Sequence, residues 1–281
     1  MISITYRSAP MRRVRLDTLL SERGMFPSRT RAAASVLAGD VLLLPGRRRA
    51  DKPGQLVPED VEVELRDGPQ FASRGGVKLA NALDLLAVDV AGRSALDVGA
   101  STGGFTDCLL QRHVAHVVAL DVAYGELDWR LRNDPRVTVI ERRNARSLRP
   151  DELPYAPDLI VIDVSFISLA KVLGAVLACA AERFDCLALV KPQFEVGRGA
   201  VGKGGVVRDP AARRGALLGV ARAASELGVA VAGFASSGLP GPKGNLETFI
   251  WLAESAREPV ADVERAVAEV EPIDPVAEVR T

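Results

Sequence analysis

The stretch that decides the fold is Ser94-Ala-Leu-Asp-Val-Gly-Ala-Ser-Thr-Gly-Gly-Phe-Thr106. An apolar run over residues 95–98 ends at Gly99, the pair Gly103-Gly104 follows, and residues 105–111 have helical spacing. Strand, glycine-rich turn and helix form the first unit of a dinucleotide-type fold, because glycine allows positive φ and lets a cofactor approach the backbone closely. The stretch therefore predicts an α/β domain built on a mostly parallel sheet.

The glycine spacing indicates what kind of cofactor this turn holds. It reads Gly99-x-x-x-Gly103-Gly104 rather than G-x-G-x-x-G, so the phosphate-cradling pattern is missing. A nucleoside cofactor without a pyrophosphate is favoured, and S-adenosylmethionine is the common case. Residues 117–121 read as a second strand ending in an acid, in the position that holds a ribose diol. The expected cofactor-binding residues are Asp97, Gly99, Ala100, Ser101, Thr102, Gly103, Gly104, Phe105, Asp121, Asn144, Ala145 and Asp163.

Four charged residues are expected near the same strand ends. Asp163 and Lys191 each end an apolar strand, over residues 159–163 and 186–191, and ligands bind at that edge of open α/β sheets. Lys78 lies in an amphipathic helical segment, and Glu247 begins a strand over residues 247–252. Asp163 could instead cap the following turn, and a lysine placed like Lys78 is usually an exposed helix charge. We expect the four to converge.

Such a group suits methyl transfer to a ribose hydroxyl. A sulfonium is already a good leaving group, so catalysis is mainly in-line placement and activation of the attacking oxygen. A lysine in its neutral form can accept the hydroxyl proton. We expect Lys191 to act as the base or to polarise the hydroxyl, Asp163 to align it, and Lys78 and Glu247 to complete the network.

The remaining segments complete the α/β pattern. Helices are expected over residues 127–132, 169–182, 210–227 and 260–270, and strands over residues 137–141 and 229–235. Residues 197–205 contain five glycines, which indicates a mobile loop near the site. This loop could close over a substrate, or it could be only a long connection.

Composition excludes several classes of protein. The 281 residues carry 36 basic and 36 acidic side chains and 48% hydrophobic residues, and no uncharged apolar run reaches the length of a membrane span. The cysteines at 108, 179 and 186 have no paired spacing, as expected of reduced core residues in a cytoplasmic protein. Two histidines, at 113 and 116, are too few for a metal site, so no metal is expected.

Charge is spread unevenly along this neutral chain. Residues 1–78 hold 14 Lys/Arg against 9 Asp/Glu, whereas residues 254–281 hold 3 against 8. Two short helices, over residues 15–24 and 28–39, precede short strands at residues 41–44 and 61–65. A basic excess in such a module is typical of a polyanion partner, although solvated surface charge is the alternative. The candidate phosphate contacts are Arg15, Arg29, Arg31, Arg47, Arg48 and Arg49.

This module resembles the small RNA-binding domain called the alpha-L fold, found in a small-subunit ribosomal protein and in many pseudouridine synthases. The matching features are Arg15-Leu-Asp17, Ser28-Arg29, Ala33, the Gly39-Asp-Val41 turn and Pro53.

The chain as a whole resembles the TlyA (haemolysin A) family of FtsJ-like RNA 2′-O-methyltransferases. The motifs are Ser73-Arg-Gly-Gly-Val-Lys78-Leu, the glycine turn above, Asp163-Val-Ser-Phe-Ile-Ser168, Leu189-Val-Lys-Pro-Gln-Phe-Glu195 and Gly244-Asn-Leu-Glu247. The resemblance implies a class I S-adenosylmethionine-dependent methyltransferase with a seven-stranded Rossmann-like sheet. It also implies methylation of cytidine ribose in 16S or 23S ribosomal RNA by a Lys-Asp-Lys-Glu tetrad, carried here by residues 78, 163, 191 and 247.

The expected domains are an extension (1–11), the RNA-binding module (12–66), a linker (67–75), the catalytic domain (76–253) and an acidic tail with a possible helix (254–281). Within the linker, Phe71 takes the aromatic position of a family segment tied to cofactor binding. A non-catalytic ribosome-assembly factor, a membrane-lytic haemolysin and a small-molecule methyltransferase are the alternatives. The sequence leaves the oligomeric state open. Ribosomal RNA or a ribosomal subunit is the expected partner, with no membrane.

Overall fold

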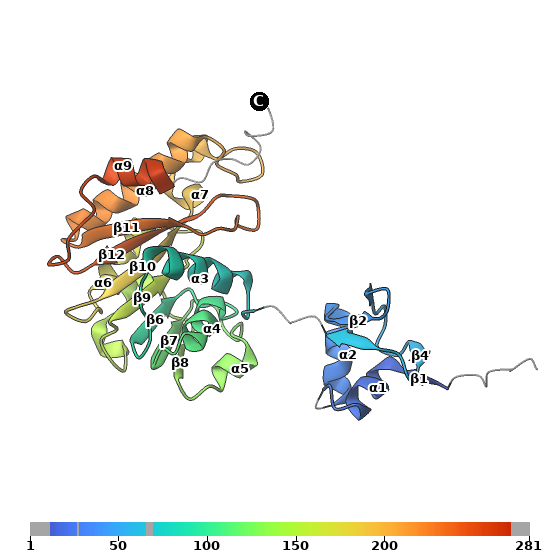
Figure 1. Cartoon of the computed structure of the whole chain (residues 1–281). Coiled ribbons are helices and arrows are strands. Elements are labelled where there is room, and N and C mark those ends of the chain that lie inside the picture. The colour runs from blue at the N-terminus through green and yellow to red at the C-terminus, as the bar shows by residue number, and fades with distance from the viewer. Residues whose placement is uncertain (1–11, 27, 66–69, 271–281) are drawn as a thin grey trace, which may run out of the picture. The chain divides into compact units, whose positions relative to one another are not determined.

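The structure is a computed structural model that describes residues 12–26, 28–65 and 70–270. The chain divides into two compact units, Met1–Gln70 and Phe71–Thr281 (Figure 1). The extension over residues 1–11 and the end of the acidic tail lie outside the described residues.

The small unit joins two helices to short strands around one apolar core. Its helices are α1 (Leu16–Glu22) and α2 (Arg29–Ala38), and its strands are β1 (Arg13–Arg15), β2 (Val41–Leu43), β3 (Arg48–Arg49), β4 (Leu56–Pro58) and β5 (Val63–Leu65). The Ser28 hydroxyl accepts the Arg31 amide at 3.2 Å, and α2 ends at Gly39 with φ 87°. These two residues cap the helix as expected from sequence. The first helix begins one residue later than expected because Arg15 is extended and pairs with Leu56.

The large unit is built on a seven-stranded sheet in the order β11-β12-β10-β9-β6-β7-β8. The strands are β6 (Ser94–Val98), β7 (His116–Leu120), β8 (Val137–Ile140), β9 (Leu159–Ile162), β10 (Asp185–Val190), β11 (Ala230–Ser236) and β12 (Thr248–Ala253). Only β12 pairs antiparallel, with β10 and with β11. This is the expected Rossmann-like, mostly parallel arrangement. In it β6, β7, β9 and β10 end at one edge of the sheet, so residues just after them come close together.

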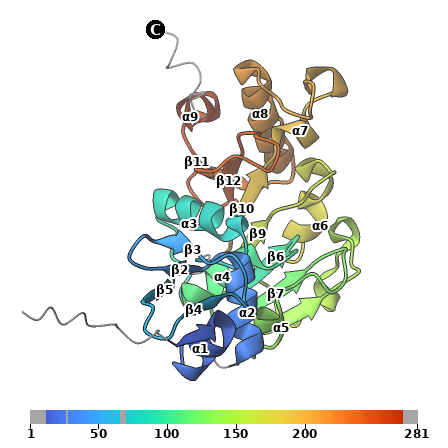
Figure 2. The same ribbon diagram turned by 90° about the vertical axis from the view of Figure 1, so that its right-hand side faces the viewer.

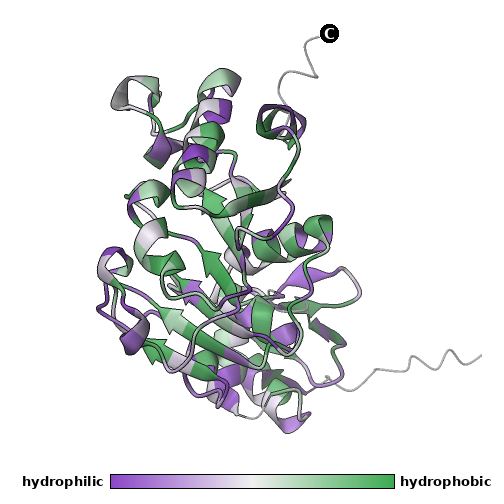
Figure 3. Cartoon of the chain, turned by 90° about the vertical axis from the view of Figure 1, so that its left-hand side faces the viewer, coloured by the Kyte–Doolittle hydropathy of each residue, from purple (hydrophilic) through white to green (hydrophobic). Residues whose placement is uncertain are grey.

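Helices cover both faces of this sheet (Figures 1 and 2). Alternate strand residues enter two separate apolar clusters, one packed with α3 (Arg74–Leu86), α4 (Gly104–Gln111) and α5 (Trp129–Arg132). The opposite cluster contains residues of α6 (Leu173–Leu177), α8 (Pro210–Glu226) and α9 (Val263–Val270). The central strands are accordingly mostly hydrophobic (Figure 3), as expected of strands buried on both faces, with Asp97 in β6 and Asp185 in β10 as buried exceptions.

Two expectations about helix boundaries were wrong. Residues 169–182 do not form one helix, since a 3₁₀ turn (Leu169–Lys171) precedes α6 and the Ala181 amide donates to the Pro157 carbonyl. The helix expected over residues 127–132 covers only Trp129–Arg132, because Asp128 caps it by accepting the Arg130 amide at 2.8 Å. The helix expected over residues 260–270 is present as α9, and its Val267 is fully buried in the apolar cluster shared with α6 and α8.

The expected linker also ends earlier than the sequence suggested. Phe71 is 4% exposed and belongs to the large unit, and the Ala72 amide donates to Asp107 at 2.7 Å. Ser73 then caps α3, accepting the Gly75 amide at 3.3 Å. Residues 71–75 are therefore part of the packing around α4 rather than a connection.

Candidate active site

The glycine turn after β6 has a geometry that only glycine fits. Gly99 has φ 87°, and a Cβ there would lie 2.3 Å from the Asp163 carbonyl oxygen. Gly103 has φ 96° and precedes α4, where a Cβ would lie 2.2 Å from Leu131 Cδ1. The turn thus lets β6, β9 and α5 approach closely, and it leaves the backbone of residues 99–102 open to a ligand.

Asp121 follows β7 and holds this turn in place. Its carboxylate accepts the Ser101 amide at 2.7 Å and the Ala123 amide at 2.8 Å. A carboxylate has about four acceptor positions, so Asp121 retains capacity for the hydroxyls of a ribose. Asn144, by contrast, already uses its side-chain oxygen to accept the Arg146 amide at 3.0 Å.

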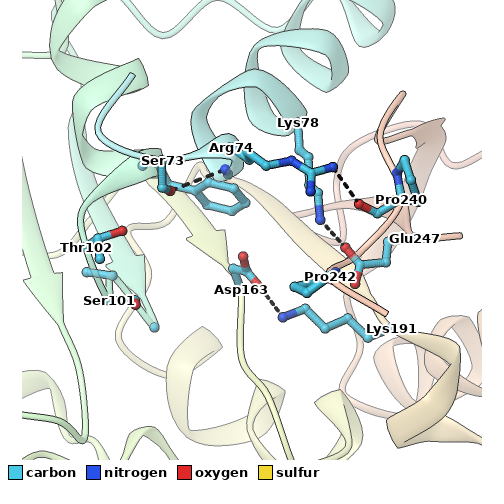
Figure 4. A pocket seen from close by; sticks show the side chains of 15 residues that line it. Ser73, Arg74, Lys78, Ser101, Thr102, Asp163, Lys191, Pro240, Pro242 and Glu247 are labelled. Atoms are coloured by element: carbon cyan, nitrogen blue, oxygen red, sulfur yellow. Dashed lines mark hydrogen bonds and ion pairs between the residues drawn. The ribbon is translucent and has the colours of Figure 1, made fainter. Parts of the chain in front are cut away.

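Two cavities meet at the end of the central strands. The Asp121 cavity, of about 350 Å³, contains Asp121, Asn144 and Ala145 in its wall. The tetrad cavity, of about 360 Å³, is lined by Lys78, Asp163, Lys191 and Glu247 (Figure 4). Both cavities are lined by Gly99, Ser101 and Asp163.

The four tetrad residues, expected to converge, lie together as two ion pairs. Lys78 contacts Glu247, and these side chains are 8% and 1% exposed. Lys191 Nζ lies 2.5 Å from Asp163 Oδ1 and donates to Ser165 Oγ at 2.9 Å. Lys78 is thus buried, not an exposed helix charge. Figure 4 shows all four side chains directed into one space.

Asp97 is a buried carboxyl group beneath the glycine turn. It is fully buried, and its Oδ2 accepts the Thr106 hydroxyl at 2.6 Å. Among the described residues, its Oδ1 has no hydrogen-bond partner. Burial, and to a smaller extent the nearby Asp163 and Asp121 carboxylates, raises the pKa of Asp97 to about 7. Asp97 lies behind the turn and is not among the residues that line either cavity.

Three further residues of the site were missed from the sequence. Ser165 is a partner of Lys191, and Arg74 lines the tetrad cavity while donating to the Pro240 carbonyl at 3.1 Å. Phe166 is 91% exposed with φ 65°, and its ring centroid lies 5.3 Å from that of Phe194. An exposed aromatic ring held in the left-handed region is a surface on which a base can stack. Ser165 and Phe166 lie within the Asp163 motif and Arg74 within the Lys78 motif, and position in these motifs was the only available signal.

The candidate RNA-binding arginines fall into two groups. Arg15 and Arg29 both pair with the buried Asp17, at 2.8 and 3.2 Å, and hydrogen bonding from Arg15 is the main reason why the pKa of Asp17 falls to about 2. Arg47 pairs with Glu64 at 2.5 Å, and Arg49 donates to the Leu37 carbonyl at 3.3 Å. Arg31 and Arg48 are exposed and have no side-chain partner within the described part of the small unit.

The described residues contain no group of three or more His, Cys, Asp or Glu side chains arranged to hold a metal ion. Over the same residues, no helix is long and apolar enough to cross a membrane.

Comparison with known proteins gives a consistent family assignment. The model of the FtsJ-like methyltransferase family matches residues 71–254. The 16S/23S rRNA (cytidine-2′-O)-methyltransferase TlyA of Mycobacterium tuberculosis is 50% identical over 92% of this chain and 98% of the relative. Hemolysin A of Brachyspira hyodysenteriae is 37% identical over 83% of this chain and 97% of its own.

Solved structures agree with this assignment. A Streptococcus thermophilus protein described as a hemolysin superposes with a TM-score of 0.69 and 36% identity, covering 92% of this chain and 96% of that one. The chain therefore belongs to the TlyA (haemolysin A) family of FtsJ-like methyltransferases.

Proposed function

We propose that this protein transfers a methyl group from S-adenosylmethionine to the ribose 2′-hydroxyl of cytidine in 16S rRNA, 23S rRNA or both. The observation that carries the proposal is the convergence of Lys78, Asp163, Lys191 and Glu247 on one cavity that adjoins a nucleoside-sized one. The relative from M. tuberculosis, 50% identical, is named for this reaction on both RNAs.

The cofactor fits the Asp121 cavity and the glycine turn. Asp121 would hold the ribose hydroxyls, and residues 144 and 145 would border the adenine. Asp97, proposed to support the cofactor site, lies buried beneath the turn. The turn over residues 99–105 would lie beside the methionine moiety of the cofactor. S-adenosylmethionine would supply the methyl group from a positively charged sulfonium sulfur, which becomes a neutral thioether when the methyl group is transferred.

The chain's own residues position and activate the attacking hydroxyl. Lys191 Nζ has three bonding positions; it donates a hydrogen bond to Ser165 Oγ and forms an ion pair with Asp163. A remaining position would bind the acceptor hydroxyl and polarise it or, in the neutral amine, take its proton. Asp163 aligns the amine, and the buried Lys78–Glu247 pair forms the opposite side of the cavity.

The small unit, proposed as an alpha-L module over residues 12–66 joined to a catalytic domain over 76–253, would bind RNA phosphates. Arg31 and Arg48 are the best candidates because both are exposed and have no side-chain partner among the described residues of this unit. Arg15 and Arg29 keep half-exposed guanidinium groups, oriented by Asp17. An rRNA substrate places the reaction in the cytoplasm, in agreement with three free cysteines.

The direct test uses purified protein, S-adenosylmethionine with a labelled methyl group, and 30S or 50S subunits from cells that lack this gene. We expect label in rRNA from at least one subunit, located by a ribose-methylation map at a single cytidine. Label on the base, or none on either subunit, would contradict the proposal.

Asp121 provides a test of cofactor binding alone. Asp121→Ala removes both the ribose acceptor and the charge that holds the Ser101 and Ala123 amides. Charge-assisted hydrogen bonds contribute about 1.5–3 kcal/mol each, so we expect the Kd for S-adenosylmethionine to rise about 10- to 100-fold. Glu126→Gln is the matched control, since Glu126 lines the same cavity but accepts only the Ser101 hydroxyl at 3.2 Å. Calorimetric titration measures both, and equal Kd values for the two variants would refute the role of Asp121.

A further inference from the structure

A group of uncommitted cations lies on the catalytic unit, in two segments that the reaction described above does not use. Lys203 and Arg208 belong to the connection between α7 (Pro192–Glu195) and α8, and Lys243 belongs to the turn before β12. All three are exposed. Within the described part of the chain, their side chains have no ion-pair or hydrogen-bond partner.

Nine arginines of the same unit are paired with nearby carboxylates. Those with an ion pair within 4.0 Å are Arg93, Arg112, Arg130, Arg132, Arg136, Arg143, Arg149, Arg257 and Arg265. Lys203, Arg208 and Lys243 are among the exposed cations of this unit for which the described residues supply no carboxylate partner.

The connection that carries Lys203 and Arg208 is fixed by buried side chains. Asn245, 1% exposed, donates to the Gly205 carbonyl at 2.8 Å and accepts the Val207 amide at 2.9 Å. Arg213, 5% exposed, donates to the Arg208 carbonyl at 2.7 Å. These hydrogen bonds tie the glycine-rich segment to the turn before β12. The backbone that carries Lys203 and Arg208 is therefore already ordered, and RNA binding does not have to supply that loss of conformational entropy.

The same turn forms part of the tetrad cavity. Pro240, Pro242 and Glu247 line that cavity, and the Gly241 amide donates to the Asn245 carbonyl at 2.8 Å. The Lys243 side chain packs close to the backbone of Gly205 in this connection. A Cβ placed on Gly205 would be 3.7 Å from Lys243 Nζ. Lys243 therefore lies in the turn against which the acceptor ribose is proposed to lie, and the connection that carries Lys203 and Arg208 is hydrogen-bonded to that turn through Asn245.

We infer that Lys203, Arg208 and Lys243 bind phosphates of the RNA strand that flanks the acceptor nucleotide. This inference rests on the proposed function and adds a second RNA-binding surface, on the catalytic unit itself. Unpaired exposed cations bind a polyanion by releasing its counterions, and the resulting affinity depends strongly on salt. Such a contact would position the strand without reading its sequence.

The test compares Lys203→Ala/Lys243→Ala with the wild-type protein in the methylation assay on ribosomal subunits, at several salt concentrations. Losing two phosphate contacts on single-stranded RNA should lower the slope of log affinity against log salt by about 1.4, which is roughly tenfold in KM at 0.15 M salt. The kcat at saturating RNA and the Kd for S-adenosylmethionine should stay unchanged. Lys203→Arg/Lys243→Arg should retain the wild-type slope.

Arg222→Ala is the matched control, because Arg222 is an exposed cation of α8 about 20 Å along the helix from Arg208. If the double alanine variant and Arg222→Ala show the same KM and salt slope as the wild type, the inference is overturned while methylation stands. A change in the Kd for S-adenosylmethionine would also overturn it, since the segment would then act on the cofactor. Failure of the wild-type protein to methylate either subunit would instead remove the proposed function.

Discussion

Lys191→Ala is expected to lower the kcat for methyl transfer by about 10²- to 10⁴-fold, the range for loss of a positioned proton-transfer group. The amine is the only tetrad group with both a charged partner, Asp163 at 2.5 Å, and a neutral one, Ser165 at 2.9 Å. Its removal leaves the acceptor hydroxyl without activation but does not alter the Asp121 cavity. Binding of S-adenosylmethionine and of rRNA should therefore change by no more than a few-fold.

Single-turnover rates with labelled methyl donor measure the loss of methyl transfer. Separate titrations of cofactor and RNA measure whether binding has changed. Ser165→Ala is the graded control, because it removes one hydrogen bond from Lys191 and leaves the ion pair. One lost hydrogen bond of about 0.5–1.5 kcal/mol predicts a loss of up to about tenfold. Near-normal turnover by Lys191→Ala would show that another group activates the hydroxyl. Tight RNA binding by a wild-type protein without turnover would favour a ribosome-assembly factor.

The edge at which the site forms could be predicted from sequence because parallel strands impose it. Asp121, Asp163 and Lys191 each directly follow an apolar run, and the ends of β7, β9 and β10 lie at one edge of the sheet. The two glycines with positive φ were recognisable because no other residue suits such a turn. These inferences need only local pattern and the handedness of the fold.

Pairing between side chains could not be predicted in the same way. Lys78 and Glu247 are 169 residues apart, and periodicity alone placed Lys78 on an exposed helix face. Likewise, Arg15 and Arg29 looked like free phosphate contacts, yet both are bound to Asp17. A basic run shows how much charge is present, whereas the fraction left for a ligand depends on which carboxylates the fold brings near.

Helix lengths were overestimated where tertiary contacts compete with local propensity. The segment over residues 169–182 is rich in Leu, Val and Ala, which favours one continuous helix. In the structure, the Ala181 amide donates to the Pro157 carbonyl, so the chain turns toward β10 after α6. Local sequence carries no signal for such a contact with another segment.

The buried Lys78–Glu247 pair predicts a second large effect, on stability as well as on activity. Lys78→Ala leaves the Glu247 carboxylate, whose side chain is 1% exposed, without its counter-charge. Removing one partner of a buried pair typically costs about 3–5 kcal/mol. We expect a loss of this size in the free energy of unfolding, measured by urea denaturation, together with loss of methyl transfer.

The double variant Lys78→Met/Glu247→Gln separates the two effects. Replacing both charges by neutral side chains of similar size removes the uncompensated buried charge, so stability should return to within about 1 kcal/mol of wild type. Methyl transfer should remain low, because the cavity that holds the acceptor has lost both charges. A double-mutant cycle gives the coupling energy between the residues. Full activity of the double variant would show that the pair only supports the fold, and that Asp163 and Lys191 alone perform the chemistry.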